Sequence, residues 1–250
     1  MMQSLEEKFK QFLDRLHASV SLDDPLFRGR FRGEKADYMF LGGFNGLRQF
    51  TILEIKSLEA VRPDVDDGKI HADFTNLLAT GQVPEVAQID DILERYDNFS
   101  GRSLNEITRS VEKTMKKASG QMLDTAAAFR LERRMWSGVV VFLIEKSDIL
   151  YMPPVAVRVA KLLKERGADD ASRFPGVNGV IIIDEAIART RDDGTSVATY
   201  DRSDILDDKY CDFFVKELLR AWLEYSNSQG NRIPKDSPFS IPFPQRPPDV

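Results

Sequence analysis

The dipeptide Asn45-Gly46 lies between two apolar runs, at residues 36–43 and 48–57. Asparagine and glycine tolerate the positive φ angles that a two-residue turn requires, so this pattern predicts a β-hairpin. Such a turn also fixes the register of the two strands, because it pairs Phe44 with Leu47 and every later pair follows from that one. The hairpin therefore constrains the fold more than any other feature of the sequence.

The predicted register brings three ionisable residues together at the open end of the hairpin. Counting outward from the turn places Asp37 directly opposite Glu54, with the two Cβ atoms roughly 5 Å apart. Lys56 lies on the same face as Glu54, because side chains alternate along a strand. Two neighbouring carboxylates repel each other, but they become a favourable site for Mg²⁺, which keeps waters for a substrate phosphate. A lysine beside them could position or activate an attacking water and stabilise charge on the phosphate.

A purely structural role for the same residues is the alternative. In that interpretation Glu54 and Lys56 are polar residues of an edge strand, and Asp37 is their ion-pair partner. The pattern Glu-x-Lys or Asp-x-Lys occurs four times in the chain, but only Glu54 and Lys56 lie on an apolar strand with an aspartate opposite. The combination, rather than the tripeptide alone, favours a metal site.

The remaining apolar periodicity predicts an α/β chain with a mixed sheet. Helices are predicted at residues 3–18 (with Ser4 as the N-cap), 86–96, 103–134, 155–165 and 203–226, and further strands at 138–145, 179–188 and 195–200. Residues 1–232 are expected to form one domain, in which 58–101 is an insertion and 146–232 a C-terminal extension. Residues 233–250 contain six prolines and are expected to form an extended tail.

At the hairpin residues the chain resembles the PD-(D/E)XK nuclease superfamily, whose metal site combines an aspartate near the start of one hairpin strand with Glu-x-Lys on the next. Asp37 matches the aspartate, and Glu54-Ile55-Lys56 matches the tripeptide. The resemblance implies a restriction-endonuclease-like core of helix, three strands, helix and strand, over residues 1–60 and 103–145. It also implies that Asp37, Glu54 and the Ile55 carbonyl hold Mg²⁺ or Mn²⁺, while Lys56 serves the attacking water.

Two outer positions of the same resemblance can be matched. Many members carry a glutamate on the first helix, for which Glu6 is the better match, and a polar residue on the helix after the Glu-x-Lys strand, for which Gln121 is the match. There are also departures: Ala36 precedes Asp37 where members carry proline, and Thr125 stands where some carry tyrosine. Glu6 and Gln121 are expected as outer contributors to the metal site.

Basic residues lie on both sides of the hairpin in the sequence. The loop at residues 24–35 is basic and contains two phenylalanines, a composition that suits phosphate contacts and base stacking. The alternative is a solvated loop whose phenylalanines dock on the core. The long predicted helix is also basic, and a solvated helix face is the simpler explanation for its charge. The candidate nucleic-acid contacts are Arg28, Arg30, Arg32, Lys35, Lys113 and Lys117.

The composition narrows the classes of function that remain. The net charge is −5, which argues against binding nucleic acid over the whole surface but leaves room for a local basic groove. The single cysteine, Cys211, excludes an internal disulfide and any all-cysteine metal site, and the presence of only two histidines argues against a histidine-rich zinc site. The longest apolar run has six residues, too few to cross a membrane, and no signal-peptide core is present, so a cytoplasmic location is expected.

These features together predict a Mg²⁺-dependent nuclease that hydrolyses phosphodiester bonds, with DNA as its partner. The resemblance alone implies a bacterial or phage setting such as restriction, defence or repair. A homodimer, and a protein partner for the Pro-rich tail, are compatible with the same sequence. The alternative function is a catalytically silent binding or interaction protein on the same scaffold.

Overall fold

A computed structural model describes the sheet, the helices that cover it and several of the connections between them. The described residues are 4–31, 33–44, 47–59, 110–145, 155, 158–159, 162–163, 173–184, 198–201 and 209–227. The predicted helix at 86–96, the start of the predicted helix at 103–134, the turn between the last two strands and the tail at 233–250 lie outside these residues.

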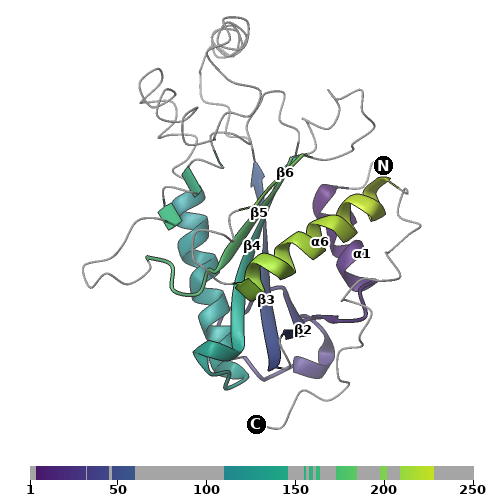
Figure 1. Ribbon diagram of the computed structural model, residues 1–250. Coiled ribbons are helices and arrows are strands. Elements are labelled where there is room, and N and C mark those ends of the chain that lie inside the picture. The colour runs from purple at the N-terminus through teal and green to yellow at the C-terminus, as the bar shows by residue number, and fades with distance from the viewer. Residues whose placement is uncertain are drawn as a thin grey trace, which may run out of the picture.

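Among the described residues, six strands form a mixed sheet at the centre of the fold (Figure 1). Its strands, in their order across the sheet, are β1 (Ser19–Ser21), β2 (Tyr38–Phe44), β3 (Leu47–Glu59), β4 (Trp136–Glu145), β5 (Gly179–Asp184) and β6 (Ala198–Asp201). The pairs β1–β2, β2–β3 and β5–β6 are antiparallel, whereas β3–β4 and β4–β5 are parallel. The predicted α/β class with a mixed sheet is therefore confirmed.

The predicted hairpin register is confirmed. Phe44 pairs with Leu47, and Tyr38 pairs with Leu53 at the other end of the β2–β3 ladder. The regular ladder begins at Tyr38 rather than at residue 36. Both strands also end later in the sequence than the apolar runs indicate. β2 continues to Phe44 instead of residue 43, and β3 continues to Glu59 instead of residue 57.

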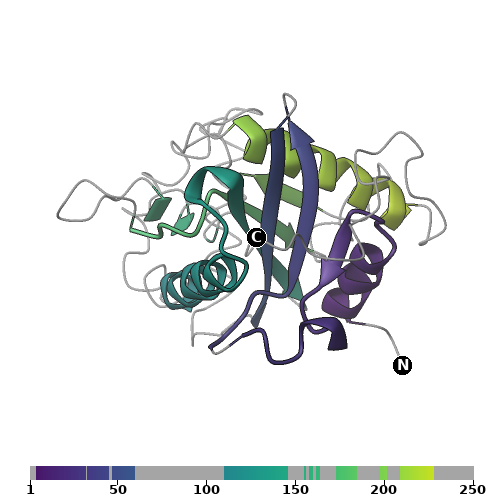
Figure 2. The ribbon, with the colours of Figure 1, turned by 90° about the horizontal axis from the view of Figure 1, so that it is seen from below.

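Helices cover both faces of the sheet. Figure 2 shows the long helix, helical over residues 110–128, on one side of the strands, and α1 (Leu5–Asp14) and α6 (Lys209–Asn227) on the other. Within the described part of the chain, none of the helices is long and apolar enough to cross a membrane.

Side-chain alternation on β3 divides the core into two layers. Ile52 packs in the layer beneath the long helix, whereas Leu53 and Ile55 pack in the layer beneath α1 and α6. Glu54 and Lys56 share the face of Ile52. The candidate site therefore lies on the side of the sheet that the long helix covers.

The first helix is shorter than predicted. Ser4 caps α1 as expected, because its hydroxyl accepts from the Glu7 N–H while the Glu7 side chain accepts from the Ser4 N–H. The helix ends at Asp14 rather than at residue 18, and the chain then enters β1. The sequence does not predict β1, because three residues carry too little pattern and the strand is defined by its pairing with β2.

The long helix also ends earlier than predicted, at residue 128 rather than 134. Arg130 adopts the left-handed conformation, with φ at 52°. Its N–H donates to the Ala127 carbonyl and the Leu131 N–H donates to the Ala126 carbonyl, which is the Schellman pattern of helix ends. An arginine occupies the position that glycine usually takes, so the sequence carries no termination signal there. A short 3-10 turn, η2 (Arg133–Met135), then leads into β4.

Gly120 offers a direct test of the long helix. It lies on the exposed side, and a methyl group there would contact nothing within 4 Å. Because glycine costs a helix interior about 1 kcal/mol relative to alanine, Gly120→Ala should raise the free energy of unfolding in urea titrations by about that amount. Gly138→Ala is the contrasting variant, because its methyl group would collide with the Gly176 carbonyl oxygen and should destabilise the protein. A loss of stability in Gly120→Ala would contradict the helix at this position.

Candidate active site

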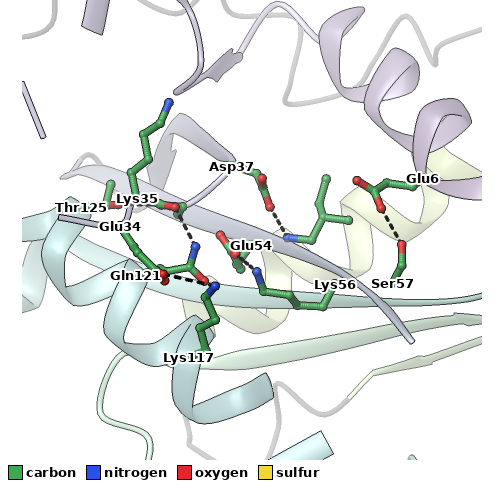
Figure 3. A network of polar contacts seen from close by, with 12 residues as sticks. Glu6, Glu34, Lys35, Asp37, Glu54, Lys56, Ser57, Lys117, Gln121 and Thr125 are labelled. Atoms are coloured by element: carbon green, nitrogen blue, oxygen red, sulfur yellow. Dashed lines mark hydrogen bonds and ion pairs between the residues drawn. The ribbon is translucent and has the colours of Figure 1, made fainter. Parts of the chain in front are cut away.

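The hairpin places two carboxylates side by side. Tyr38 pairs with Leu53, so Asp37 and Glu54 are the next opposing residues, one step beyond the last pair of the ladder. Asp37 Oδ2 accepts a hydrogen bond of 2.7 Å from the Ile55 N–H, which anchors this carboxylate to β3 (Figure 3). Glu54 is 1% exposed, whereas Asp37 is half-buried. The structure thus brings together the two carboxylates that the register predicts.

Lys56 supplies positive charge to this pair. Its Nζ forms an ion pair with Glu54 Oε1, and its side chain remains 22% exposed. Glu54 Oε2 is buried and has no hydrogen-bond partner among the described residues. A buried carboxylate oxygen without a donor is costly, so this oxygen is suited to bind a ligand from outside the protein.

Burial and mutual repulsion make both carboxylates reluctant to ionise. Burial, followed by the neighbouring charge of Asp37, raises the pKa of Glu54 to about 7, although Lys56 and the Asp37 N–H act in the opposite direction. Burial also raises the pKa of Asp37, while the hydrogen bond from Ile55 opposes that rise. A divalent cation between the two side chains would replace their repulsion by attraction.

The residues present fit a hard divalent cation. Mg²⁺ binds proteins through one or two carboxylates and keeps several of its waters. Asp37 and Glu54 provide two carboxylates, and the peptide of Ile55 lies against Asp37 through its N–H. Within the described residues, no group of three or more histidine, cysteine, aspartate and glutamate side chains could hold a metal. Glu54 Oε2, which has no donor among the residues that the structure describes, is the atom that most favours a cation here.

Glu6 lies beside the site and is bound by other partners. It comes from α1, on the opposite face of the sheet from Glu54, and Figure 3 shows it next to Ser57 of β3. Glu6 accepts hydrogen bonds of 2.6 Å from the Ser57 hydroxyl and 2.7 Å from Lys10 Nζ. The bond from Lys10, followed by the bond from Ser57, lowers the pKa of Glu6. Glu6 is an outer neighbour of the site, and its partners Lys10 and Ser57 are residues that the sequence analysis missed.

The long helix reaches the site through the backbone that precedes Asp37. Gln121 Nε2 donates a hydrogen bond of 3.0 Å to the Lys35 carbonyl, and the Ala36 N–H donates one of 2.9 Å to Thr125 Oγ1. Gln121 therefore contacts the backbone two residues before Asp37, and its contribution to a metal site stays a prediction. In the family resemblance, Thr125 is only a departure from the pattern, because it stands where some members carry tyrosine. The signal for it was a polar residue within the apolar stripe, one turn after Gln121.

The two phenylalanines of the basic loop dock on the core. Phe27 is buried in the 3-10 turn η1 (Pro25–Phe27), and its ring centroid lies 5.6 Å from that of Phe129. Phe31 is partly buried and contacts the same ring at 5.8 Å. These two rings therefore pack on the core, as the alternative interpretation of the loop expects, and their positions do not support base stacking.

The candidate basic residues have several different environments. Arg30 lies 4.2 Å over the Phe129 ring, Lys35 forms an ion pair of 2.5 Å with Asp23, and Lys117 forms one of 3.3 Å with Glu34. Figure 3 shows the Lys35 side chain pointing away from the carboxylates. Of the other predicted nucleic-acid contacts, Arg28 and Lys113 are exposed, and Arg32 lies outside the described residues.

Comparisons with known proteins found no relative. No protein-family model matches the sequence, no curated protein matches it, and no solved structure matches the fold. The functional conclusion therefore rests on the geometry of Asp37, Glu54 and Lys56.

We predict that Glu54→Gln stabilises the protein at alkaline pH when no divalent cation is present. The unfolded chain loses the Glu54 proton near the ordinary pKa of 4.5, whereas the folded chain keeps it until about pH 7. Stability is therefore lost progressively between pH 4.5 and 7, and the full penalty, roughly 3 kcal/mol, persists above that range. Glutamine carries no such penalty, so the variant should be more stable than the wild type at alkaline pH and converge with it near pH 4.5.

Urea titrations in EDTA across this pH range measure the difference. Glu132→Gln, which changes an exposed carboxylate, is the matched control and should follow the wild type at every pH. The same pH dependence in the wild type and in Glu54→Gln would contradict the penalty assigned to the buried carboxylate.

Proposed function

We propose that this chain is a Mg²⁺-dependent nuclease that hydrolyses phosphodiester bonds in DNA. The observation that carries the proposal is the pair of carboxylates, Asp37 and Glu54, at the open end of the β2–β3 hairpin. Lys56 is bound to Glu54, and Glu54 Oε2 has no partner among the described residues. Two adjacent carboxylates and a lysine suit metal-assisted attack of water on a phosphodiester.

The order of the elements supports the same proposal. Among the described α-helices and strands, the order along the chain is α1, β1, β2, β3, the long helix and β4, which is the order of helix, three strands, helix and strand that the resemblance implies. β1, which the sequence does not predict, is the first of those three strands. We infer that these elements form a restriction-endonuclease-like core, with β5, β6 and α6 as its C-terminal extension.

Each residue has a distinct role in the proposed reaction. Asp37 and Glu54 would hold Mg²⁺ with the Ile55 carbonyl, and the bound cation would supply positive charge beside the scissile phosphate. Lys56 would orient the attacking water and stabilise the negative charge that develops on the phosphate. Its partial exposure suits this role, because the ammonium lies against Glu54 and part of the side chain remains open to solvent. Arg28, Lys113 and Lys117 would contact backbone phosphates, which position a nucleic acid without reading its sequence.

We predict that Lys56→Ala abolishes most of a metal-dependent cleavage activity. Plasmid, linear duplex and single-stranded DNA, together with single-stranded RNA, should be incubated with the protein in Mg²⁺, in Mn²⁺ and in EDTA. The wild type should cleave DNA only with a divalent cation, and Lys56→Ala should reduce the rate at least ~100-fold, because one group that stabilises the transition state is lost. Lys216→Ala, on α6, is the matched control and should retain the wild-type rate.

Two results would overturn this proposal. One is the absence of cleavage on every substrate combined with a melting temperature that Mn²⁺ does not change. The other is cleavage that persists in EDTA or in Lys56→Ala. The first result would favour a catalytically silent binding protein, and capture of partners with and without residues 233–250 would then be the next experiment.

A further inference from the structure

Three successive turns of the long helix contact three successive residues of the segment that leads into Asp37. The contacts are spaced four residues apart on the helix and one residue apart on this segment, and Figure 3 shows Lys117, Gln121 and Thr125 on the helix. From the exposed end inward, the pairs are Lys117 with Glu34 at 3.3 Å, Gln121 with the Lys35 carbonyl at 3.0 Å, and Thr125 with the Ala36 N–H at 2.9 Å.

The innermost contact, between Thr125 and Ala36, is buried, so water cannot take the place of either hydrogen-bond partner. Lys117 and Glu34 are both more than half exposed, so their ion pair contributes little. Thr125 and Ala36, in contrast, are 0% and 2% exposed. A buried N–H that loses its acceptor keeps the full cost of desolvation. The hydroxyl of Thr125 therefore holds the Ala36 peptide in place.

Asp37 is held at three points, by three different parts of the chain. On its N-terminal side, the preceding peptide is bound by Thr125. On its C-terminal side, the Asp37 carbonyl accepts a hydrogen bond of 2.9 Å from the Leu22 N–H. Its carboxylate accepts from the Ile55 N–H. Because the regular β2–β3 ladder begins only at Tyr38, these contacts decide where the Asp37 carboxylate lies relative to Glu54.

We propose that Thr125 is a positioning residue of the candidate metal site: its hydroxyl fixes the Ala36 peptide and so sets the place where Asp37 meets a divalent cation beside Glu54. This inference rests on the proposed function, and it adds a residue from the long helix whose hydrogen bond goes to the Ala36 peptide. Outer residues that orient metal ligands typically change metal affinity or activity by about 10- to 100-fold when they are lost. We expect the loss of the Thr125 hydroxyl to change metal affinity by an amount within that range.

The test uses the full chain and Mn²⁺ as the probe. Thr125→Val keeps the shape of the side chain and removes the acceptor, whereas Thr125→Ser keeps the hydroxyl. Thr51→Val is the matched control, because Thr51 is equally buried and its hydroxyl donates to Tyr210 on the opposite face of the sheet. Calorimetric titration with MnCl₂ measures affinity independently of activity, and the Mn²⁺ concentration at half-maximal cleavage is the second readout.

We expect Thr125→Val to weaken Mn²⁺ binding about 10-fold or more and to raise the Mn²⁺ requirement for cleavage in parallel. Thr125→Ser and Thr51→Val should bind Mn²⁺ as the wild type does, even though Thr51→Val also lowers the melting temperature. If Thr125→Val does not fold, the pair Thr125→Ser and Thr125→Ala carries the same comparison, with the loss expected only in the alanine variant.

Two outcomes would refute the inference while leaving the nuclease proposal intact. In one, the wild type binds Mn²⁺ and cleaves DNA, and Thr125→Val does so with the same Mn²⁺ dependence. In the other, Thr51→Val loses as much Mn²⁺ affinity as Thr125→Val, which would assign both effects to general destabilisation. A wild type that neither binds Mn²⁺ nor cleaves DNA would overturn both the proposed function and the role of Thr125.

Discussion

The antiparallel pairing of β2 with β3 fixes the position of every ionisable group in the candidate site. Opposing residues share one face of a sheet, so the pair Tyr38 and Leu53 puts Asp37 next to Glu54 on the side of the long helix. A shift of one residue in β3 would turn Glu54 into the apolar layer beneath α1 and α6, where Leu53 and Ile55 now lie. The chemistry proposed for this chain therefore depends on the register.

The site is unfavourable for the folded protein by itself. Glu54 is almost fully buried beside a second carboxylate, and its pKa of about 7 records the cost of ionising it there. Lys56 offsets part of this cost, but buried ion pairs can often be replaced by apolar residues without loss of stability. Strongly perturbed carboxylates gather at functional sites, where the cost is balanced by binding or catalysis. This imbalance is the physical reason for proposing that Asp37 and Glu54 bind a divalent cation.

The features of this structure that depend on a few adjacent residues are predictable from the sequence. Features that depend on contacts between distant residues, or on an unusual backbone conformation, are not. The hairpin register and the cap at Ser4 each depend on a few adjacent residues, so the sequence alone identified them. The sequence pattern predicts the end of the long helix too late, because Arg130 adopts a left-handed conformation that glycine usually adopts. The hydrogen bond between Thr125 and Ala36 joins residues far apart in the chain, and no local pattern encodes such a contact. β1 escaped prediction for the same reason, because it exists only through its pairing with β2.

We propose that Asp37 and Glu54 together bind a divalent cation. Anomalous diffraction from crystals of the protein grown in MnCl₂ would locate such a cation. We expect an anomalous peak between the two carboxylates, with oxygen ligands at about 2.1 Å, close to the distance typical of Mg²⁺. We also expect Glu54 Oε2 to be one of those ligands. The absence of a peak there, with the ion pair between Glu54 and Lys56 unchanged, would show that these two carboxylates do not form a cation site.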